Sequence, residues 1–286
     1  MMRTCVLVAA TLLSLPANPL YAQLSDEQVD QAIARGVAHL WSQQKADGTF
    51  TGSETYLGES YPGAPTVMAM LALAYASESL EKPEMQKGLK ALLELDLQKT
   101  YTVGFRIIAL AELYQQADQA ARDGLRNAIR QDVTKLLDWQ LAGGGWIYQK
   151  SDGGTWDFSN TQLAVLALRE AARAGVEIKT DAYMKVQKLY LDHQQPDGGW
   201  NYGRPPSGQN VNNGPSYGSM TAAGVASLFI TREALEPGVG CPCRNGRSSG
   251  RRNAQVDQAI AKGVGWLGQH FATNENVLCA NFVKSY

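Results

Sequence analysis

Hydrophobic positions recur along the chain with the spacing of amphipathic helices. The clearest example is a nonapeptide, VDQAIARGV at residues 29–37, which returns as VDQAIAKGV at residues 256–264 with a single substitution. In both copies apolar or small residues fall at i, i+3, i+4, i+7 and i+8, which is one face of a helix. Gly36 and Gly263 lie on that face, where a missing side chain lets another helix approach closely. The repeated segment therefore predicts two equivalent amphipathic helices.

A second class of segment is apolar on nearly every side. Residues 66–73, 161–168 and 221–228 each begin with Thr and align without gaps, and residues 103–110 are a weaker relative. A helix without a polar face is typically buried. These segments therefore predict inner helices, each of which follows an amphipathic outer helix.

Turns rich in glycine connect the outer helices to the inner ones. Residues 43–50, 140–146 and 194–200 place Gln at a helix end, then glycine, then an aromatic residue. The three aromatic residues are Phe50, Trp146 and Trp200. Their spacing gives a repeat of about 50 residues, in which the copy at residues 89–110 lacks the aromatic. Because no stretch alternates polar and apolar residues for long, the pattern predicts an all-α repeat protein with negligible sheet.

Composition narrows the classes of function. The chain has 286 residues, with 26 Lys and Arg against 27 Asp and Glu, and a formal net charge of −1 at pH 7. This balance and a hydrophobic content of 44% exclude a disordered chain and give no sign of binding to nucleic acid. The 28 glycines lack a collagen-like period, so they are expected to serve turns.

The first residues are typical of a targeting segment. A basic start precedes an apolar run at residues 5–15, and the small residue Ala22 stands before Gln23. This order is that of a cleaved signal peptide, and the run is too short to span a bilayer; an uncleaved anchor is the alternative. We therefore expect residues 1–22 to be removed. Residues 23–286 are then one exported repeat domain, periplasmic or extracellular, without a membrane span.

One segment interrupts the repeats. Residues 237–253 are rich in Gly and Arg and contain Cys241 and Cys243. No second pair of Cys or His lies at the spacing of a metal site, so we expect a loop insertion. In an oxidising compartment one disulfide to Cys279 can form, and the sequence leaves the pairing open.

The turn pattern Gln-x(2–5)-Gly-x-Trp resembles the QW repeat of the squalene-hopene cyclase and protein prenyltransferase superfamily. The resemblance extends over roughly residues 27–270. It implies an α/α toroid, a double barrel with amphipathic helices outside and apolar helices inside. Five outer helices have only four inner partners, because residues 274–286 are too short and too polar to supply the last. We therefore expect an incomplete last pair or a truncated chain, with the apolar face of the final outer helix exposed.

The same resemblance implies sites whose residues this chain lacks. In triterpene cyclases an Asp-x-Asp-Asp motif opens an inner helix, and its middle Asp protonates the substrate. The matching residues here read Asp-Phe-Ser-Asn at 157–160, so Ser159, a very weak acid, stands at the donor position. Protein prenyltransferases bind zinc through Asp, Cys and His, where this chain has Asp157, Ser159 and Gly218. We expect no metal and no cofactor, and residues 157–160 also fit an ordinary helix N-cap.

Aromatic and acidic residues gather in the turns that lead into the inner helices, at one end of the predicted ring. The carboxylates that could serve acid-base chemistry are Asp157, Glu54 and Glu59. The aromatic residues that could hold a ligand are Tyr56, Tyr61, Trp156, Phe158 and Tyr217. Phe50, Trp146 and Trp200 are instead expected to pack between adjacent helix pairs.

These candidates support two main hypotheses and leave open whether the chain is an enzyme. The favoured one is a binding module whose cavity holds a small molecule, a glycan or a protein segment. The alternative is an enzyme acting on an isoprenoid or a polysaccharide, with Asp157 as general acid and Glu54 or Glu59 as its partner. A purely structural repeat domain, with its cavity filled by side chains, is the third. A raised pKa of Asp157 beside a deep apolar cavity favours the enzyme, whereas capping of its own helix favours the binding module.

Overall fold

The computed structural model describes residues 25–56, 58–151, 155–203, 214–236, 253–273 and 275–276. Its helices are α1 (Asp26–Ser42), α2 (Ala64–Tyr75), α3 (Pro83–Glu94), α4 (Thr100–Gln116), α5 (Gln119–Asp138), α6 (Phe158–Arg173), α7 (Thr180–Asp192), α8 (Gly218–Leu235) and α9 (Ala254–Gln269). Two short strands, β1 (Thr55–Tyr56) and β2 (Glu59–Ser60), pair antiparallel. The all-α prediction is confirmed. None of the described helices is long and apolar enough to cross a membrane.

Three predictions fall outside the described residues. They are the signal peptide at residues 1–22, all but the last residue of the insertion at residues 237–253, and the pairing of Cys241, Cys243 and Cys279. The exported location and the extent of the mature domain therefore stay predictions.

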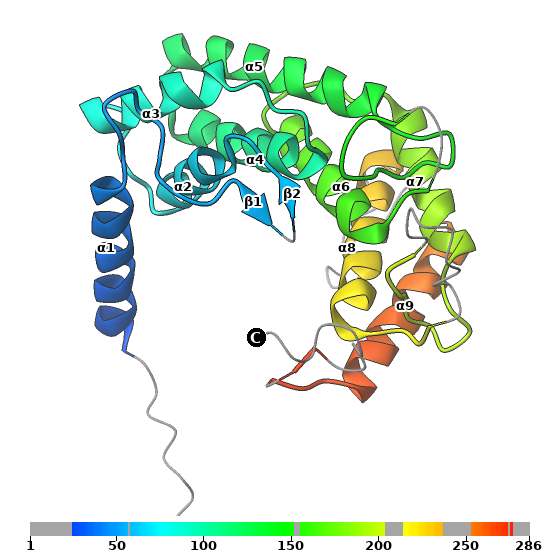
Figure 1. Ribbon diagram of the computed structural model, residues 1–286. Coiled ribbons are helices and arrows are strands. Elements are labelled where there is room, and N and C mark those ends of the chain that lie inside the picture. The colour runs from blue at the N-terminus through cyan, green and yellow to red at the C-terminus, as the bar shows by residue number, and fades with distance from the viewer. Residues whose placement is uncertain are drawn as a thin grey trace, which may run out of the picture.

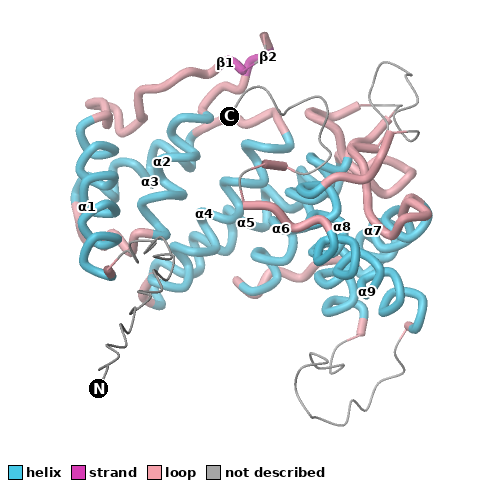
Figure 2. Tube along the Cα trace, turned by 90° about the horizontal axis from the view of Figure 1, so that it is seen from below, coloured by secondary structure: helices cyan, strands magenta, loops and turns pink. Residues whose placement is uncertain are grey.

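The helices form two layers around an open arc (Figure 1). The apolar helices α2, α4, α6 and α8 follow one another along the inner side, and each contacts the next. The amphipathic helices α1, α3, α5, α7 and α9 lie outside them. Figure 2 shows the β1–β2 hairpin at one end of the helices. Outer and inner helices therefore alternate along the chain in the same order as the amphipathic and apolar segments of the sequence.

The glycine turns join neighbouring repeats through a recurring pair of hydrogen bonds. The side-chain amide of Gln140 donates to the carbonyl oxygen of Gly144 in its own turn, at 2.9 Å, and to that of Ala182 in α7, at 3.1 Å. Gln194 and Gln44 make the equivalent bonds to the outer helices α9 and α3. The Gln of each turn therefore attaches that turn to the following outer helix.

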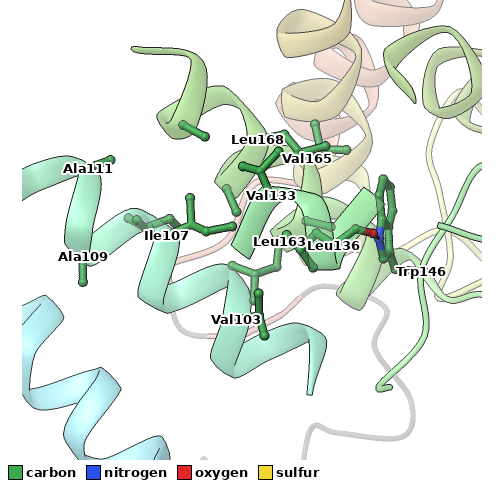
Figure 3. Packing of buried hydrophobic residues seen from close by; sticks show 14 of the residues in the cluster. Val103, Ile107, Ala109, Ala111, Val133, Leu136, Trp146, Leu163, Val165 and Leu168 are labelled. Carbon is green, nitrogen blue, oxygen red and sulfur yellow. Dashed lines mark hydrogen bonds between the residues drawn. The ribbon is translucent and has the colours of Figure 1, made fainter. Parts of the chain in front are cut away.

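The aromatic residue of each turn is fixed within its own repeat. The backbone N–H of Trp146 donates to the hydroxyl of Thr161, at 3.0 Å, and its indole N–H donates to the carbonyl oxygen of Leu136, at 2.7 Å. Figure 3 shows Trp146 beside Leu136 in the core. Trp200 makes the same two kinds of bond, and Phe50 makes the first. The Thr that opens these inner helices is thus the acceptor for the turn, and all three aromatic side chains are buried.

Glycine is required at the tightest point of these turns. Gly144 has a φ of +93°, and a Cβ there would lie 2.5 Å from the carbonyl oxygen of Lys185 in α7. Gly198 has a φ of +92°, and a Cβ there would lie 3.0 Å from the side chain of Lys262 in α9. L-residues with a side chain rarely adopt this backbone conformation. The glycines therefore permit close contact between each turn and the next outer helix.

An arginine holds together the repeat that lacks an aromatic turn. Arg106 on α4 donates to both carboxylate oxygens of Asp132 on α5, at 2.7 and 2.6 Å. It also donates to the carbonyl oxygens of Leu92 and Leu95 at the end of α3, at 3.2 and 2.6 Å. The last carbonyls of a helix lack partners within the helix, and a cation there is favourable. Arg106 therefore connects α3, α4 and α5 without a glycine turn.

The two copies of the nonapeptide have different surroundings. In α9, Val256, Ile260 and Gly263 are buried, and a Cβ on Gly263 would collide with Val225 of α8. In α1 none of the residues is buried, and Ile33, the counterpart of Ile260, is 50% exposed. The expectation that the final outer helix exposes its apolar face is therefore wrong for all of that face except Val264, which is 50% exposed. The bare face belongs to α1, at the other end of the arc (Figure 1).

A polar contact attaches the end of α1 to the connection between α2 and α3. The indole N–H of Trp41 donates to the carboxylate of Glu78 at 2.9 Å, and the ammonium group of Lys82 donates to the same oxygen at 2.5 Å. The hydrogen bond from Lys82 lowers the pKa of Glu78 below its ordinary value of 4.5, and the bond from Trp41 acts in the same direction. The attachment of α1 therefore depends on an ionised carboxylate.

Candidate functional site

A cavity of about 810 Å³ lies where α2 and α4 begin, next to the β1–β2 hairpin and the segment at residues 147–151. Its apolar lining includes Val67, Met68, Phe105 and Ile147. The lining residues that carry hydroxyl groups are Tyr56, Tyr61, Tyr101, Thr102, Tyr148, Ser151, Ser159 and Tyr202. The volume lies within the range of sites for small molecules, about 300–1,000 Å³. An open cavity of this size counts against the hypothesis of a ring filled by side chains.

Three of these hydroxyl groups form a chain of hydrogen bonds that we call the hydroxyl row, Ser159, Tyr202 and Tyr148. The Ser159 hydroxyl lies 2.8 Å from that of Tyr202, which lies 2.8 Å from that of Tyr148. Behind the cavity wall, Ser159 donates to the carboxylate of Asp157 at 2.7 Å. The row thus links a buried carboxylate to the cavity.

Asp157 is the N-cap of α6 and is completely buried. Its carboxylate accepts hydrogen bonds from the backbone N–H and the side-chain amide of Asn160, both at 2.8 Å, as well as from Ser159. Burial raises the pKa of Asp157 above its ordinary value of 3.8, and these hydrogen bonds oppose that increase. A raised pKa of Asp157 was expected for the enzyme, and capping of its own helix was expected for the binding module. Asp157 shows both features. The side chain does not itself line the cavity.

Three tyrosines of the cavity are held in their neutral form. Burial raises the pKa of Tyr101 to about 12. Burial also raises the pKa of Tyr202 and of Tyr148, and the negative charge of Asp157 contributes in each case. The hydroxyls therefore serve as neutral hydrogen-bonding groups near pH 7.

No protein-family model and no curated protein matches this chain. Among solved structures, it is similar to ent-copalyl diphosphate synthase from Streptomyces platensis, with a TM-score of 0.54 and 21% sequence identity. The match covers 84% of this chain and 40% of the synthase, so the chain spans less than half the length of that protein. The chain has a terpenoid cyclase-like fold. At this identity the similarity establishes the fold alone.

The three predicted carboxylates have separate local roles. Asp157 caps α6, and Glu54 accepts a hydrogen bond from the backbone N–H of Gly63, at 2.9 Å, where α2 begins. Glu59 pairs with Lys99 at 3.3 Å and is the only one of the three that lines the cavity. Within the described part of the chain, no group of three His, Cys, Asp or Glu side chains could hold a metal ion.

The five predicted ligand-binding aromatic residues divide into two groups. Tyr56 and Tyr61 line the cavity. Phe158 instead stacks on Tyr190 in the core, with ring centroids 4.4 Å apart, and Trp156 packs against Phe158 at 4.8 Å. Tyr217 is the N-cap residue of α8 and does not line the cavity either. Position next to an inner helix was therefore not sufficient to identify the wall of the cavity.

The structure adds Tyr101, Lys99 and Phe105 to the site. All three lie at the start of α4, the inner helix of the repeat without an aromatic turn. Lys99 donates to the side chain of Gln149 at 2.9 Å, and its ammonium group lies 5.5 Å from the ring centroid of Tyr61. These three residues could have been found from the sequence by aligning the first residues of all four inner helices, including the divergent one.

Proposed function

We propose that this chain is an exported repeat protein of the squalene-hopene cyclase and prenyltransferase type that binds an apolar small molecule, such as an isoprenoid, in the cavity at the start of α2 and α4. One observation carries the proposal. The cavity combines a mostly apolar lining with hydroxyl groups from several elements, which is the composition of sites for small molecules. The mostly apolar lining favours an isoprenoid over a glycan.

The position of Asp157 supports binding over acid catalysis. Its carboxylate is used as the N-cap of α6, and the hydroxyl of Ser159 stands between it and the cavity. A general acid must lie within hydrogen-bond reach of the atom that it protonates, or reach it through one water molecule. Asp157 meets neither requirement directly.

An enzyme remains the second candidate because one observation favours it. The hydroxyl row connects Asp157, whose pKa is raised by burial, to the cavity through groups that can pass a proton. Turnover of an isoprenoid that is lost in Asp157→Asn, with binding retained, would establish this function in place of simple binding.

Titration of residues 23–286 with farnesol, an isoprenoid alcohol, in a calorimeter tests the proposal. Ala64 lines the cavity at the first turn of α2, so Ala64→Trp places a large ring in it. We expect binding of farnesol to the wild type and a loss of roughly tenfold or more in affinity for this variant, because the apolar contacts are excluded. Ala34→Trp, the same change on the exposed α1, is the matched control. No binding by the wild type, or equal affinity in Ala64→Trp, would contradict the proposal.

A further inference from the structure

The direction of the hydrogen bonds in the hydroxyl row is fixed by Asp157, the carboxylate to which Ser159 is bonded. Asp157 lies at the N-terminus of α6, where the helix dipole favours negative charge, and the three groups that hydrogen-bond to its side chain are donors. An ionised carboxylate only accepts hydrogen bonds. The single hydrogen of the Ser159 hydroxyl is therefore committed to Asp157.

Each following hydroxyl must then donate toward Asp157. Ser159 has no second hydrogen to give, so the hydroxyl of Tyr202, 2.8 Å away, is the donor in that pair. Tyr202 has then used its own hydrogen, so Tyr148, 2.8 Å further on, donates to Tyr202. The oxygen of Tyr148 is left with a lone pair at the wall of the cavity.

We propose that the oxygen of Tyr148 selects a ligand with a hydrogen-bond donor, so that the cavity prefers an apolar alcohol over a molecule of the same shape without a hydroxyl hydrogen. This inference rests on the proposed function and names the ligand class within it. A neutral hydroxyl fits better than an ammonium group, because the ammonium group of Lys99 already lies in the same lining. A phosphate or carboxylate ligand supplies acceptors only, so it cannot use the lone pair of Tyr148 and would have to pair with the ammonium group of Lys99 instead.

A matched pair of probes tests the proposal. Farnesol and farnesyl methyl ether share one apolar body, and only the alcohol has a donor. We expect residues 23–286 to bind the alcohol about five- to tenfold more tightly than the ether in calorimetric titrations, as one neutral hydrogen bond allows. Tyr148→Phe should abolish the preference while the affinity for the ether stays the same. Tyr75→Phe, on the exposed side of α2 outside the cavity, is the control and should keep the full preference.

The outcomes separate this inference from the function on which it rests. Equal affinity of the wild type for alcohol and ether, a preference that survives in Tyr148→Phe, or tighter binding of farnesyl diphosphate than of farnesol would overturn the selection of a donor. Each of these results would leave an apolar binding site in place. Failure of both alcohol and ether to bind would instead refute the proposed function, and the inference with it.

Discussion

The buried pair of Arg106 and Asp132 allows a quantitative test of the repeat without an aromatic turn. Their side chains are 9% and 5% exposed, and two hydrogen bonds join them. Asp132→Ala removes both bonds and leaves the guanidinium group buried without its counter-charge. Removal of one partner from a buried ion pair typically costs about 3–5 kcal/mol. We expect a loss of that size in the free energy of unfolding, because Arg106 keeps only its bonds to the carbonyls of α3 as compensation.

Urea unfolding of residues 23–286, followed by far-ultraviolet circular dichroism, measures this loss. The double variant Arg106→Met with Asp132→Leu removes both charges and retains apolar volume, so it should be more stable than Asp132→Ala. If Asp132→Ala costs less than about 1 kcal/mol, or if the double variant is the less stable of the two, then the pair is not what holds α3, α4 and α5 together.

Three further predictions concern stability. Ile260→Ala should cost about 2–4 kcal/mol in urea unfolding, whereas Ile33→Ala, at the equivalent position of the exposed copy, should change stability by about 0.5 kcal/mol or less. A similar cost at both positions would show that α1 is covered. The stabilising effect of Glu78 is the difference in the free energy of unfolding between the wild type and Glu78→Gln. It should be complete above pH 4.5 and disappear as the pH falls through the lower pKa that Glu78 has in the folded state. A stability difference that does not change with pH would contradict the ion pair. In thermal unfolding, Gly58→Ala should cost roughly 1 kcal/mol, because Gly58 has a positive φ but no close neighbour. Gly144→Ala should cost well over that amount, because Gly144 has a positive φ and also lies against α7. Equal costs would argue against that close contact.

Features that depend on short segments were visible in the sequence. The Gln, glycine and aromatic residues of each turn bond to each other or to the adjoining helices, so their spacing is set by local geometry and repeats with the fold. The Thr at the start of the inner helices was visible as a pattern, but its function as acceptor for the turn required the structure.

Features that depend on contacts between distant residues were not visible. Two nearly identical nonapeptides have different exposure because only one is next to α8, and no property of the segment itself encodes that difference. Asp157 was recognised as important, yet its connection to the cavity runs through Tyr202, 45 residues further along the chain. The cavity wall also uses Tyr101 from the most divergent repeat, where alignment of the pattern is weakest.

A crystal structure of residues 23–286 grown with farnesol tests most directly whether the cavity is a ligand site. We predict the isoprenoid chain between Val67 and Phe105, with its hydroxyl oxygen about 2.8 Å from the oxygen of Tyr148. A cavity that holds only water in these crystals, with farnesol absent or bound on the bare face of α1, would contradict the proposed function.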